Sequence, residues 1–404
     1  MLQRNKRHLQ QVSLENSPPS QDYFKELLSN FGASDLANKV LEGDVTDELD
    51  KYPTIVRQWL HQFRRTDEEK KECVPIDGFI ERCDFQQAFK SAKEKTSSSP
   101  SGIHYTFWKC IATDDAISDY MAIMMRLPFM YGFCNDRWAK CIDVMLEKKK
   151  GVRKIHLLRI IGLVEADFNT ALKFFFAKQM VANSERTQLT EEQWGGRPGK
   201  TATEPALRKM LAFEYGRVLF VTIALFANDA VACFDRMVPN ISTLVAMKYG
   251  ISENIMISRN MAMKKMEHGV RTSHGDSAGT YTEEPGDPPL AGETQGKGDV
   301  PSLWSVGSHI LLRLHKLLHS GINLPHVAGT SRIEKNNDAF VDDCDGMASQ
   351  QRPTFSQSET ATRIHLQTGA QVWNDTINAS GQSIAFHKSI WQMAAYDNSY
   401  FPWP

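Results

Sequence analysis

No apolar run in the sequence approaches the roughly 20 residues that a membrane-spanning helix needs. The start, Met1–His8, is basic and polar, and no apolar segment follows it, so a secretory signal is not indicated either. These absences argue against a protein that is secreted or embedded in a membrane. The sequence therefore predicts an intracellular protein, in the nucleus or the cytoplasm.

A pattern of paired cysteines is also missing. The seven cysteines are scattered along the chain, they are odd in number, and none belongs to a Cys-x-x-Cys pair. A disulfide framework would need an even set, and a structural zinc site would need cysteines at short spacing. The cysteine pattern thus favours a reducing compartment and argues against a structural zinc site.

The excess of positive charge that nucleic-acid-binding proteins usually carry is absent from the chain as a whole. Lysine and arginine number 47 against 48 acidic residues, which gives a formal net charge of −1. The positive charge is nevertheless concentrated in one block, Lys148–Arg159, with Arg197 and Lys200 further along. Such a block can bind phosphates while acidic surfaces elsewhere cancel the sum, or it can be a solvated surface.

The chain is long enough for two or three domains, or for one large protein with several lobes, since 41% of its 404 residues are hydrophobic. Composition and hydrophobic periodicity divide it into segments. The segments are a disordered tail (1–20), a helical N-terminal extension (21–95), a region of strands and helices (96–215), a second such region (216–395) with a long loop (271–299), and a C-terminal tail (396–404).

The mixture of elements predicts an α/β protein of the α+β kind. Apolar runs at Leu219–Phe226 and Asp338–Val341 are typical of strands. The spacing of leucines predicts a helix over Pro301–Ser320, and a second helix is expected over Thr362–Ser380. The polar segment 345–360 is expected to be a loop.

A short aspartate signal occurs twice, each time after a strand-like run. The first copy spans Asp229–Asp235, and the second is Phe340-Val-Asp342-Asp343. Carboxylates at the ends of buried strands are costly unless a cation binds there. Two or three of them converging on one point suit a pair of divalent metal ions. The sequence therefore predicts a metal site formed by the two aspartate signals.

Further motifs accompany these two in a fixed order. Along the chain they are Ser99-Pro-Ser-Gly102-Ile103, Arg159-Ile-Ile-Gly-Leu163, Gln193-Trp-Gly-Gly-Arg197-Pro-Gly199, Asp229 with Phe234-Asp235, Gly292 with Gln295-Gly296, Phe340-Val-Asp342-Asp343, and Ser380-Gly381 with Lys388 and Trp391. Taken in this order, they resemble a reverse transcriptase of the non-LTR, LINE-like retroelement type, over roughly residues 96–395. Each motif alone is weak, but their order and their strand or helix context agree with the family.

The resemblance implies the fold of a right-hand polymerase. Residues 96–215 would form the fingers, and residues 216–395 the palm, with an antiparallel sheet backed by helices. No thumb segment is recognised after about residue 395. The expected fold is thus an α/β (α+β) polymerase with fingers, a palm and a helical N-terminal extension.

The resemblance also implies a catalytic site for two Mg²⁺ ions, with Mn²⁺ as the alternative. Asp229 and Asp342 would be the main metal ligands, and Asp343 a weaker third one. On its own, Asp342-Asp343 would read as a hairpin tip, and the company of Asp229 favours the metal site. Asp235 fits a helix N-cap as well as a ligand, so it is not included in the catalytic set.

For the incoming nucleotide, the resemblance implies Arg159 and Lys154 at the triphosphate, and Gln295 and Gly296 beneath the nucleotide or the template–primer duplex. Lys388 would donate a proton to pyrophosphate, with a solvated surface lysine as the alternative. The expected reaction is template-directed addition of dNTPs to a DNA primer on an RNA template.

Phe234 bears on the choice of sugar. Its ring would press on the 2′ position of the nucleotide and exclude a ribose hydroxyl, although a plain core phenylalanine is the alternative. Gly102, Arg197 and Lys200 would contact nucleic acid. No membrane partner is expected, and the sequence indicates no protein partner.

Two alternative functions stay open. An RNA-directed RNA polymerase has a similar palm, but that family places a small polar or acidic group where this chain has Phe234. A non-catalytic, nucleic-acid-binding remnant of a retroelement polymerase is the other, favoured by the missing thumb and the neutral net charge.

Overall fold

The protein is described by a computed structural model that covers residues 1–45, 47–93, 99–187, 189–325, 332–350, 352 and 354–396, without the side chains of 323–325, 332, 333 and 355. The predicted boundary at residues 95–96 and the predicted tail from 397 onward lie outside these residues. The chain divides into two compact units, each built from three segments of sequence. Unit 1 comprises Met1–Tyr52, Phe63–Gln188 and Phe234–Trp304, and unit 2 comprises Pro53–Gln62, Leu189–Cys233 and Ser305–Pro404.

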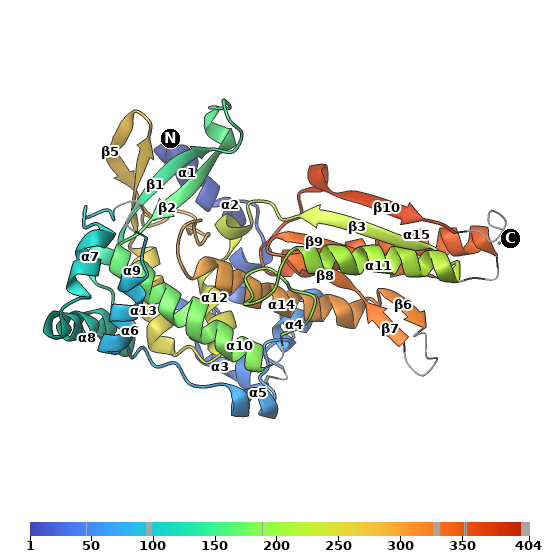
Figure 1. The fold of residues 1–404 in the computed structure, drawn as a ribbon, viewed down its shortest axis with the longest axis horizontal. Coiled ribbons are helices and arrows are strands. Elements are labelled where there is room, and N and C mark those ends of the chain that lie inside the picture. The colour runs from blue at the N-terminus through green and yellow to red at the C-terminus, as the bar shows by residue number, and fades with distance from the viewer. Residues whose placement is uncertain are drawn as a thin grey trace. The chain divides into compact units, whose positions relative to one another are not determined.

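Unit 1 combines helices with a four-stranded sheet of order β2-β1-β4-β5 (Figure 1). Strands β1 and β4 pair in parallel, and the other neighbours are antiparallel. The strands are β1 (Lys140–Glu147), β2 (Leu158–Leu163), β4 (Glu267–Thr272) and β5 (Gly275–Tyr281). The helices are α1 (Leu2–Leu9), α2 (Gln11–Leu14), α3 (Asp35–Glu42), α5 (Asp67–Glu72), α6 (Arg82–Lys90), α7 (Tyr105–Ile111), α8 (Asp115–Tyr131), α9 (Ala166–Leu172), α10 (Val181–Arg186), α12 (Pro239–Lys248) and α13 (Glu253–Lys264).

Residues 1–20 differ from the disordered tail that their polar composition predicts. They form α1 and α2, and α1 lies alongside the sheet of unit 1 (Figure 1). Leu9 is only 2% exposed and packs in a cluster with Met145 and Ile160 of the sheet. The Asn5 side-chain amide donates a hydrogen bond to the Asp143 carboxylate at 3.1 Å. These few buried contacts order the segment, and average composition does not reveal them.

The predicted long loop 271–299 is shorter in the structure. Its beginning belongs to the β4–β5 hairpin, and residues 282–299 then run without helix or strand to the start of α14 (Val300–Leu318). The glycine at the hairpin turn, Gly275, has φ +113°, a value that strongly favours glycine.

Unit 2 is built around a four-stranded antiparallel sheet of order β10-β3-β9-β8. Its strands are β3 (Ile223–Asp229), β8 (Asn337–Phe340), β9 (Asp343–Ser349) and β10 (Ile390–Ala394), with a separate hairpin of β6 (Ile322–Pro325) and β7 (Arg332–Lys335). Its helices are α4 (Thr54–His61), α11 (Thr203–Leu219), α15 (Phe355–Ala379) and α14 from Ser305 onward. Throughout the described ranges, no helix is both long and apolar enough to cross a membrane.

Helices α11 and α15 pack on opposite faces of this sheet (Figure 1). Ile223 of β3 packs beside Gly216 of α11, whereas Asn228 accepts a hydrogen bond from the Trp373 indole of α15 at 3.2 Å. Successive strand residues point to opposite faces, so Asp229 shares the α11 face with Ile223. The mixed α+β class predicted from the sequence is confirmed, and the sheet of unit 2 is antiparallel with helices packed on it.

Residues 345–349 lie in a strand, whereas the polarity of the segment 345–360 predicts a loop. Residues 343–349 form β9, the strand between β3 and β8. Cys344, Met347 and Ala348 are each at most 3% exposed, and the strand is paired along both edges. The prediction fails because burial of these few residues and pairing with distant strands outweigh the local polar pattern.

A buried histidine, His315, joins α14 to α15. Its Nε2 lies 2.9 Å from the carbonyl oxygen of Gly369, and its Nδ1 lies 2.7 Å from the amide nitrogen of Asn337. A carbonyl can only accept and an amide nitrogen can only donate, so these contacts fit the neutral ring with its proton on Nε2. Burial, helped by the nearby His319, lowers the pKa of His315 to about 4.

This pKa predicts a loss of stability of unit 2 in mild acid. A histidine held neutral in the folded state contributes stability above its unfolded pKa of 6.5, and that stability is lost as the pH falls toward 4. Between pH 7.5 and pH 5, denaturant unfolding should show a decrease attributable to His315 of about 2 kcal/mol in the free energy of unfolding. His315→Gln, which cannot titrate, should lose that much less than the wild type over the same range. Equal losses in both proteins would refute the assignment.

Candidate functional site

The three predicted metal ligands come together at one end of the sheet of unit 2. Asp229 is the last residue of β3 and stands directly opposite Asp343, the first residue of β9. Residues opposite each other in an antiparallel pair have Cβ atoms about 4.5–5.5 Å apart. Asp342 lies beside them in the two-residue turn between Phe340 and Asp343, where Val341 has φ +59°. Strand pairing thus brings together two aspartate signals that lie far apart in the sequence.

The electrostatics of Asp343 reflect this crowding of carboxylates. Partial burial and the negative charges of Asp342, Asp229 and Asp345 raise the pKa of Asp343, and the positive charge of Lys388 acts in the opposite direction. Neighbouring like charges disfavour ionisation, which is the condition that a bound cation relieves. The sheet end therefore brings four carboxylates close together.

Two lysines supply the partial compensation. Lys388, just before β10, forms an ion pair with Asp229, and Lys209 of α11 forms one with Asp345. The Lys388 side chain is 55% exposed, so its ammonium group can leave Asp229 at little cost. A cavity of about 360 Å³ opens over this group, and its lining includes Asp229, Asp343, Asp345, Phe340, Lys209 and Lys388.

The donor set fits Mg²⁺ by its chemistry, because all the donors are carboxylate oxygens. The three aspartates are not one of the described groups of three possible ligands whose atoms all lie within 4.8 Å of one another. Mg²⁺ usually takes one or two carboxylates together with water and substrate phosphates, and it does not need a closed protein cage. An open cluster of this kind is therefore suited to a metal that arrives with its substrate.

The Gln193–Gly199 loop of unit 2 packs against the hairpin that carries Asp342 and Asp343. The Trp194 backbone N–H donates to the carbonyl of Ala339 at 2.8 Å, and the Trp194 indole donates to Asp338 at 3.2 Å. A Cβ placed on Gly195 would lie 2.3 Å from the backbone nitrogen of Val341. The sequence marks this glycine as part of a motif, and the structure gives it a close approach to the hairpin turn.

Arg197 and Lys200, predicted to contact nucleic acid, have intramolecular partners in this loop. The Arg197 guanidinium donates to the carbonyls of Thr190 and Gln193 at 2.7 and 3.0 Å, which fastens the loop. Lys200 is exposed, with its ammonium group 5.0 Å from the centre of the Trp194 ring. Arg197 thus serves the local fold, whereas Lys200 stays accessible.

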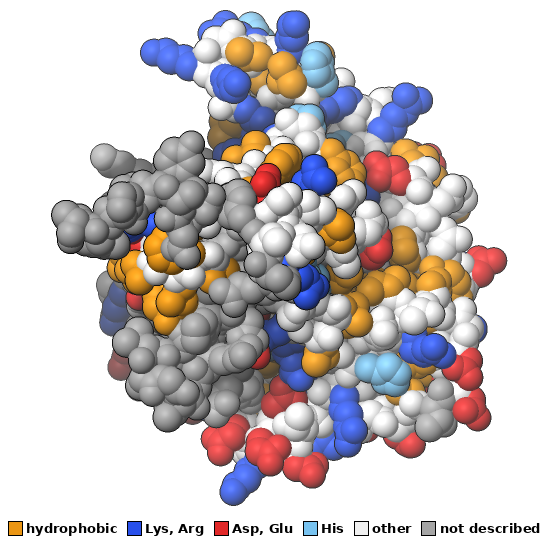
Figure 2. Space-filling model, turned by 90° about the vertical axis from the view of Figure 1, so that its right-hand side faces the viewer, with side chains coloured by type: hydrophobic (Ala, Val, Ile, Leu, Met, Phe, Trp, Pro, Cys, Tyr) orange, Lys and Arg blue, Asp and Glu red, His pale blue; other side chains and the backbone are white. Residues whose placement is uncertain are grey.

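In unit 1, Lys154 and Arg159 lie in the hairpin formed by β1 and β2. Lys148, Lys149, Lys150, Arg153, Lys154 and Arg159 are all exposed. Figure 2 shows lysine and arginine side chains gathered on the hairpin that projects at the top of the view. The basic block of the sequence is thus a basic surface on a projecting hairpin.

Gln295 and Gly296 lie beside strand β2 in the same unit. The Gly162 backbone N–H donates to the Gln295 carbonyl at 2.6 Å. Gly296 has φ +113°, and a Cβ there would lie 2.5 Å from the Gly162 carbonyl oxygen. Since Arg159 belongs to β2 as well, the structure places two predicted nucleotide-binding motifs next to each other.

Phe234 and Asp235 also belong to unit 1, in a 3₁₀ turn over Cys233–Arg236. Phe234 is partly buried. The Asp235 carboxylate lies 2.9 Å from His8 Nε2 of α1, so it holds the N-terminal helix. It is not the N-cap of the following helix α12, whose N-cap is Val238. The contact with His8 of α1 is one that the sequence alone does not reveal.

Gly102 lies in an exposed turn of unit 1 with φ +79°. The turn is closed by a hydrogen bond from the Gly102 N–H to the Ser99 carbonyl at 2.9 Å, and Ser101 donates to the buried Glu165 carboxylate. The turn is firmly anchored and its glycine faces open space.

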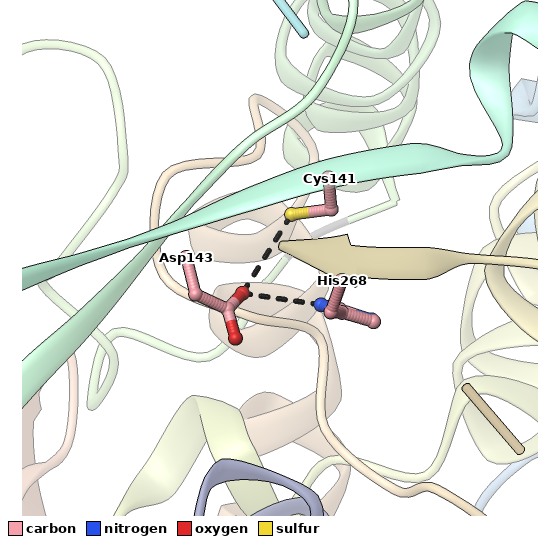
Figure 3. Close-up of side chains that lie close together, drawn as sticks. All are labelled: Cys141, Asp143 and His268. Carbon is pink, nitrogen blue, oxygen red and sulfur yellow. Dashed lines mark hydrogen bonds and ion pairs between the residues drawn. The ribbon is translucent and has the colours of Figure 1, made fainter. Parts of the chain in front are cut away.

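A second cluster of possible ligands, Cys141, Asp143 and His268, is buried in the sheet of unit 1 (Figure 3). His268 Nδ1 lies 3.1 Å from one Asp143 oxygen, and Tyr281 and Asn5 donate to the other at 2.6 and 3.1 Å. Burial raises the pKa of the Cys141 thiol well above its ordinary value. The Asp143 carboxylate is already satisfied by protein donors, so this cluster is explained as the anchor of α1.

Comparison with models of known protein families gives no match for this chain, and comparison with curated proteins gives none either. A function has to follow from the residues of the chain and their geometry.

The close approach of Gly195 predicts that Gly195→Ala displaces the hairpin. The added methyl group meets backbone and not a flexible side chain, and overpacking of this kind costs about 1–3 kcal/mol in the free energy of unfolding. Gly269→Ala is the matched control, because its Cβ would meet its nearest neighbour, the Cys141 carbonyl oxygen, only at 3.9 Å. Denaturant unfolding should show a loss for Gly195→Ala and less than about 0.5 kcal/mol for the control. Two equally stable variants would contradict the contact.

Proposed function

We propose that this chain is a reverse transcriptase, an RNA-directed DNA polymerase of the non-LTR retroelement type. The observation that carries the proposal is the pairing of β3 with β9, which sets Asp229 opposite Asp343 with Asp342 in the adjacent turn. Carboxylates gathered at the end of an antiparallel sheet suit nucleotidyl transfer assisted by two metal ions. The order of the surrounding motifs supports a template-directed reaction.

On this proposal, the sheet of unit 2 corresponds to the palm and the β1–β2 hairpin of unit 1 to part of the fingers. The partners are an RNA template, a DNA primer and dNTPs, inside the cell in the nucleus or the cytoplasm. The exposed lysines and arginines of the hairpin suit the phosphates of these partners.

Asp229 and Asp342 would hold two Mg²⁺ ions, or Mn²⁺, with Asp343 as a third and weaker ligand. When bound, such ions activate the primer 3′-hydroxyl and stabilise the departing pyrophosphate. Lys388, now paired with Asp229, would carry the proton at Nζ that pyrophosphate takes up. Its exposure lets the side chain move from the carboxylate to the leaving group.

The nucleotide would be oriented by the remaining predicted residues. Arg159 presents a planar guanidinium for bidentate contact with phosphate, and Lys154 adds a point charge. Gln295 and Gly296, beside β2, would lie under the nucleotide or the duplex. Phe234 would exclude the ribose 2′-hydroxyl.

A non-catalytic nucleic-acid-binding protein is the second candidate. The ion pair between Lys388 and Asp229 favours it, because a cationic side chain already neutralises one predicted metal ligand. The third reading, an RNA-directed RNA polymerase, is disfavoured by the aromatic side chain of Phe234.

Primer extension on an RNA template with Mg²⁺ and dNTPs tests the proposal. The wild type should extend the primer, and Asp342→Asn should lose about 100-fold or more, because it removes a charged metal ligand without changing shape. Asp276→Asn, the same change at an exposed carboxylate of the β5 hairpin, should leave extension unchanged. Absence of extension by the wild type, together with salt-sensitive RNA binding, would favour the non-catalytic candidate.

The role of Phe234 can be tested by the choice of nucleotide. Phe234→Ala should raise the use of NTPs relative to dNTPs by about 10-fold or more, since removal of the ring admits the 2′-hydroxyl. Phe213→Ala truncates another partly buried phenylalanine, on α11, and should leave that ratio unchanged. An unchanged ratio in both variants would make Phe234 a core residue only.

A further inference from the structure

The loop Gly292–Asp299, which carries Gln295 and Gly296, is fastened by ionic groups that are buried in unit 1. Arg259 of α13 and the loop residues Glu293 and Asp299 are all 0% exposed, and Lys297 is 2% exposed. Buried charges are costly unless they are paired and hydrogen-bonded. The presence of four of them around one short loop calls for a physical reason.

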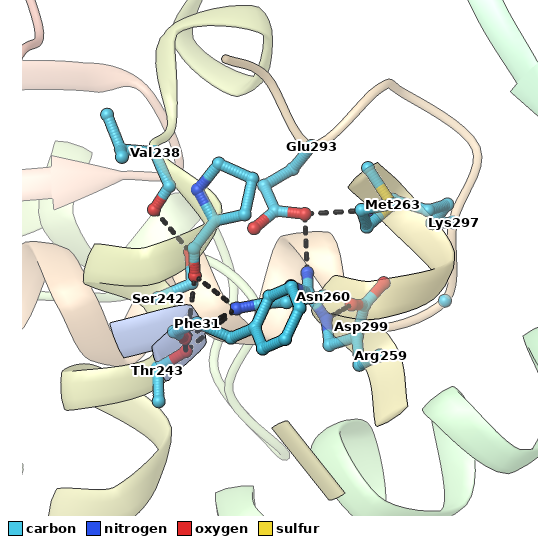
Figure 4. Close-up of polar contacts among 12 residues, drawn as sticks. Phe31, Val238, Ser242, Thr243, Arg259, Asn260, Met263, Glu293, Lys297 and Asp299 are labelled. Atoms are coloured by element: carbon cyan, nitrogen blue, oxygen red, sulfur yellow. Dashed lines mark hydrogen bonds and ion pairs between the residues drawn. The ribbon is translucent and has the colours of Figure 1, made fainter. Parts of the chain in front are cut away.

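Arg259 is the centre of this network (Figure 4). Its Nε donates to Asp299 at 2.6 Å, its Nη1 donates to the Asn260 side chain at 2.7 Å, and its Nη2 pairs with Glu293. Lys297 reaches the same Glu293 oxygen at 2.8 Å. Two cations and two anions balance, so the network is neutral as a whole.

Arg259 pairs with both carboxylates, and Lys297 pairs with Glu293 as well. The second oxygens, Glu293 Oε1 and Asp299 Oδ1, accept no hydrogen bond from the described residues. Although burial opposes the charged form of Arg259, Asp299 and Glu293 raise its pKa above the ordinary value. The guanidinium therefore stays charged and binds two separate points of the loop at once, which its planar fork allows and a lysine ammonium does not.

The loop held in this way makes backbone contacts at its other side. The Glu293 N–H donates to the carbonyl of Phe234 at 2.8 Å, and the Gly292 N–H donates to Met237 at 2.7 Å. The Gln295 carbonyl accepts from Gly162 of β2 at 2.6 Å. Fixing the ends of the loop thus fixes Gln295 against β2, the strand of Arg159, and fixes Glu293 against the turn of Phe234.

Helix α13 is also held through Asn260, the neighbour of Arg259. Asn260 donates hydrogen bonds to the carbonyls of Phe31 and Pro239 at 3.0 and 3.2 Å, and to the Thr243 hydroxyl at 2.9 Å. Phe31 belongs to the N-terminal extension, to which the sequence assigns no chemistry. The extension therefore braces the helix that carries Arg259.

We propose that Arg259 is a positioning residue, which holds the loop Gly292–Asp299 so that Gln295 and Gly296 stay against Gly162 of β2, the strand that also carries Arg159. The effect on nucleotide binding rests on the proposed function, whereas the effect on the loop does not. Because Arg259 pairs with Glu293 and Asp299, near the two ends of the loop, its loss should affect this loop first.

The test uses a variant of the full chain that keeps the charge balance. Arg259→Met alone would leave a buried carboxylate uncompensated and can fail to fold. The double variant Arg259→Met/Asp299→Asn removes one charge of each sign and retains the ion pair between Lys297 and Glu293. The matched control is Lys248→Met/Glu69→Gln, which removes another buried ion pair of unit 1, between α12 and α5.

Hydrogen exchange reads the position of the loop directly. In the double variant, protection of the Gly162 and Glu293 amides should fall about 10-fold or more, because their acceptors are in or beside the released loop. The control variant should leave both amides protected as in the wild type. Wild-type protection of both amides in the Arg259 variant would overturn the proposal, as would equal loss in the control.

Primer extension adds a readout that general destabilisation would not give. The double variant Arg259→Met/Asp299→Asn should raise the KM for dNTPs about 10-fold with less than about a threefold change in kcat. The single variant Arg259→Lys should have a KM between those of the wild type and the double variant. An equal fall in kcat without a change in KM would contradict the positioning role. If the wild type incorporates no dNTP, the proposed function fails, and the exchange data still decide the position of the loop.

Discussion

The antiparallel pairing of β3 with β9 is the constraint on which the rest of the account depends. It places Asp229 opposite Asp343 although more than a quarter of the chain separates them in sequence. Because side chains alternate along a strand, a shift of one residue in this register would send one aspartate to the opposite face. The buried neighbours of β9, with Cys344 and Met347 on its two faces, oppose such a shift.

Neighbouring groups of unit 2 surround the clustered aspartates at the end of its sheet. The Trp194 loop packs on the hairpin from one side, and Lys388 and Lys209 pair with two of the four carboxylates. Burial, together with repulsion from the neighbouring carboxylates, raises the pKa of Asp343. A protein gains little stability from such an arrangement, and clustered groups with a perturbed pKa are typical of functional sites.

Hydrophobic spacing and short motifs allowed part of the fold and of the candidate site to be predicted from the sequence. The helix expected over Pro301–Ser320 is α14 (Val300–Leu318), and the aspartate motifs fall at strand ends as expected. The sequence did not predict that residues 1–20 are ordered or that residues 343–349 form strand β9. Both result from a few contacts with residues far away in the sequence. The same holds for Arg259, which reads as one more charge in a polar helix until Glu293 and Asp299 are seen around it. The sequence shows which side chains each motif carries. Strand pairing and ion pairing between residues far apart in the sequence determine which motifs lie close together.

The central claim is that Asp229 and Asp342 hold a pair of divalent ions. A crystal structure of the full chain with Mn²⁺ and a dNTP tests it most directly, because Mn²⁺ is located by its anomalous scattering. The account predicts two Mn²⁺ ions about 3.5–4 Å apart, bound by Asp229 and Asp342, with Lys388 released from Asp229. A structure in which Lys388 remains paired with Asp229 and no Mn²⁺ lies between the two aspartates would contradict it.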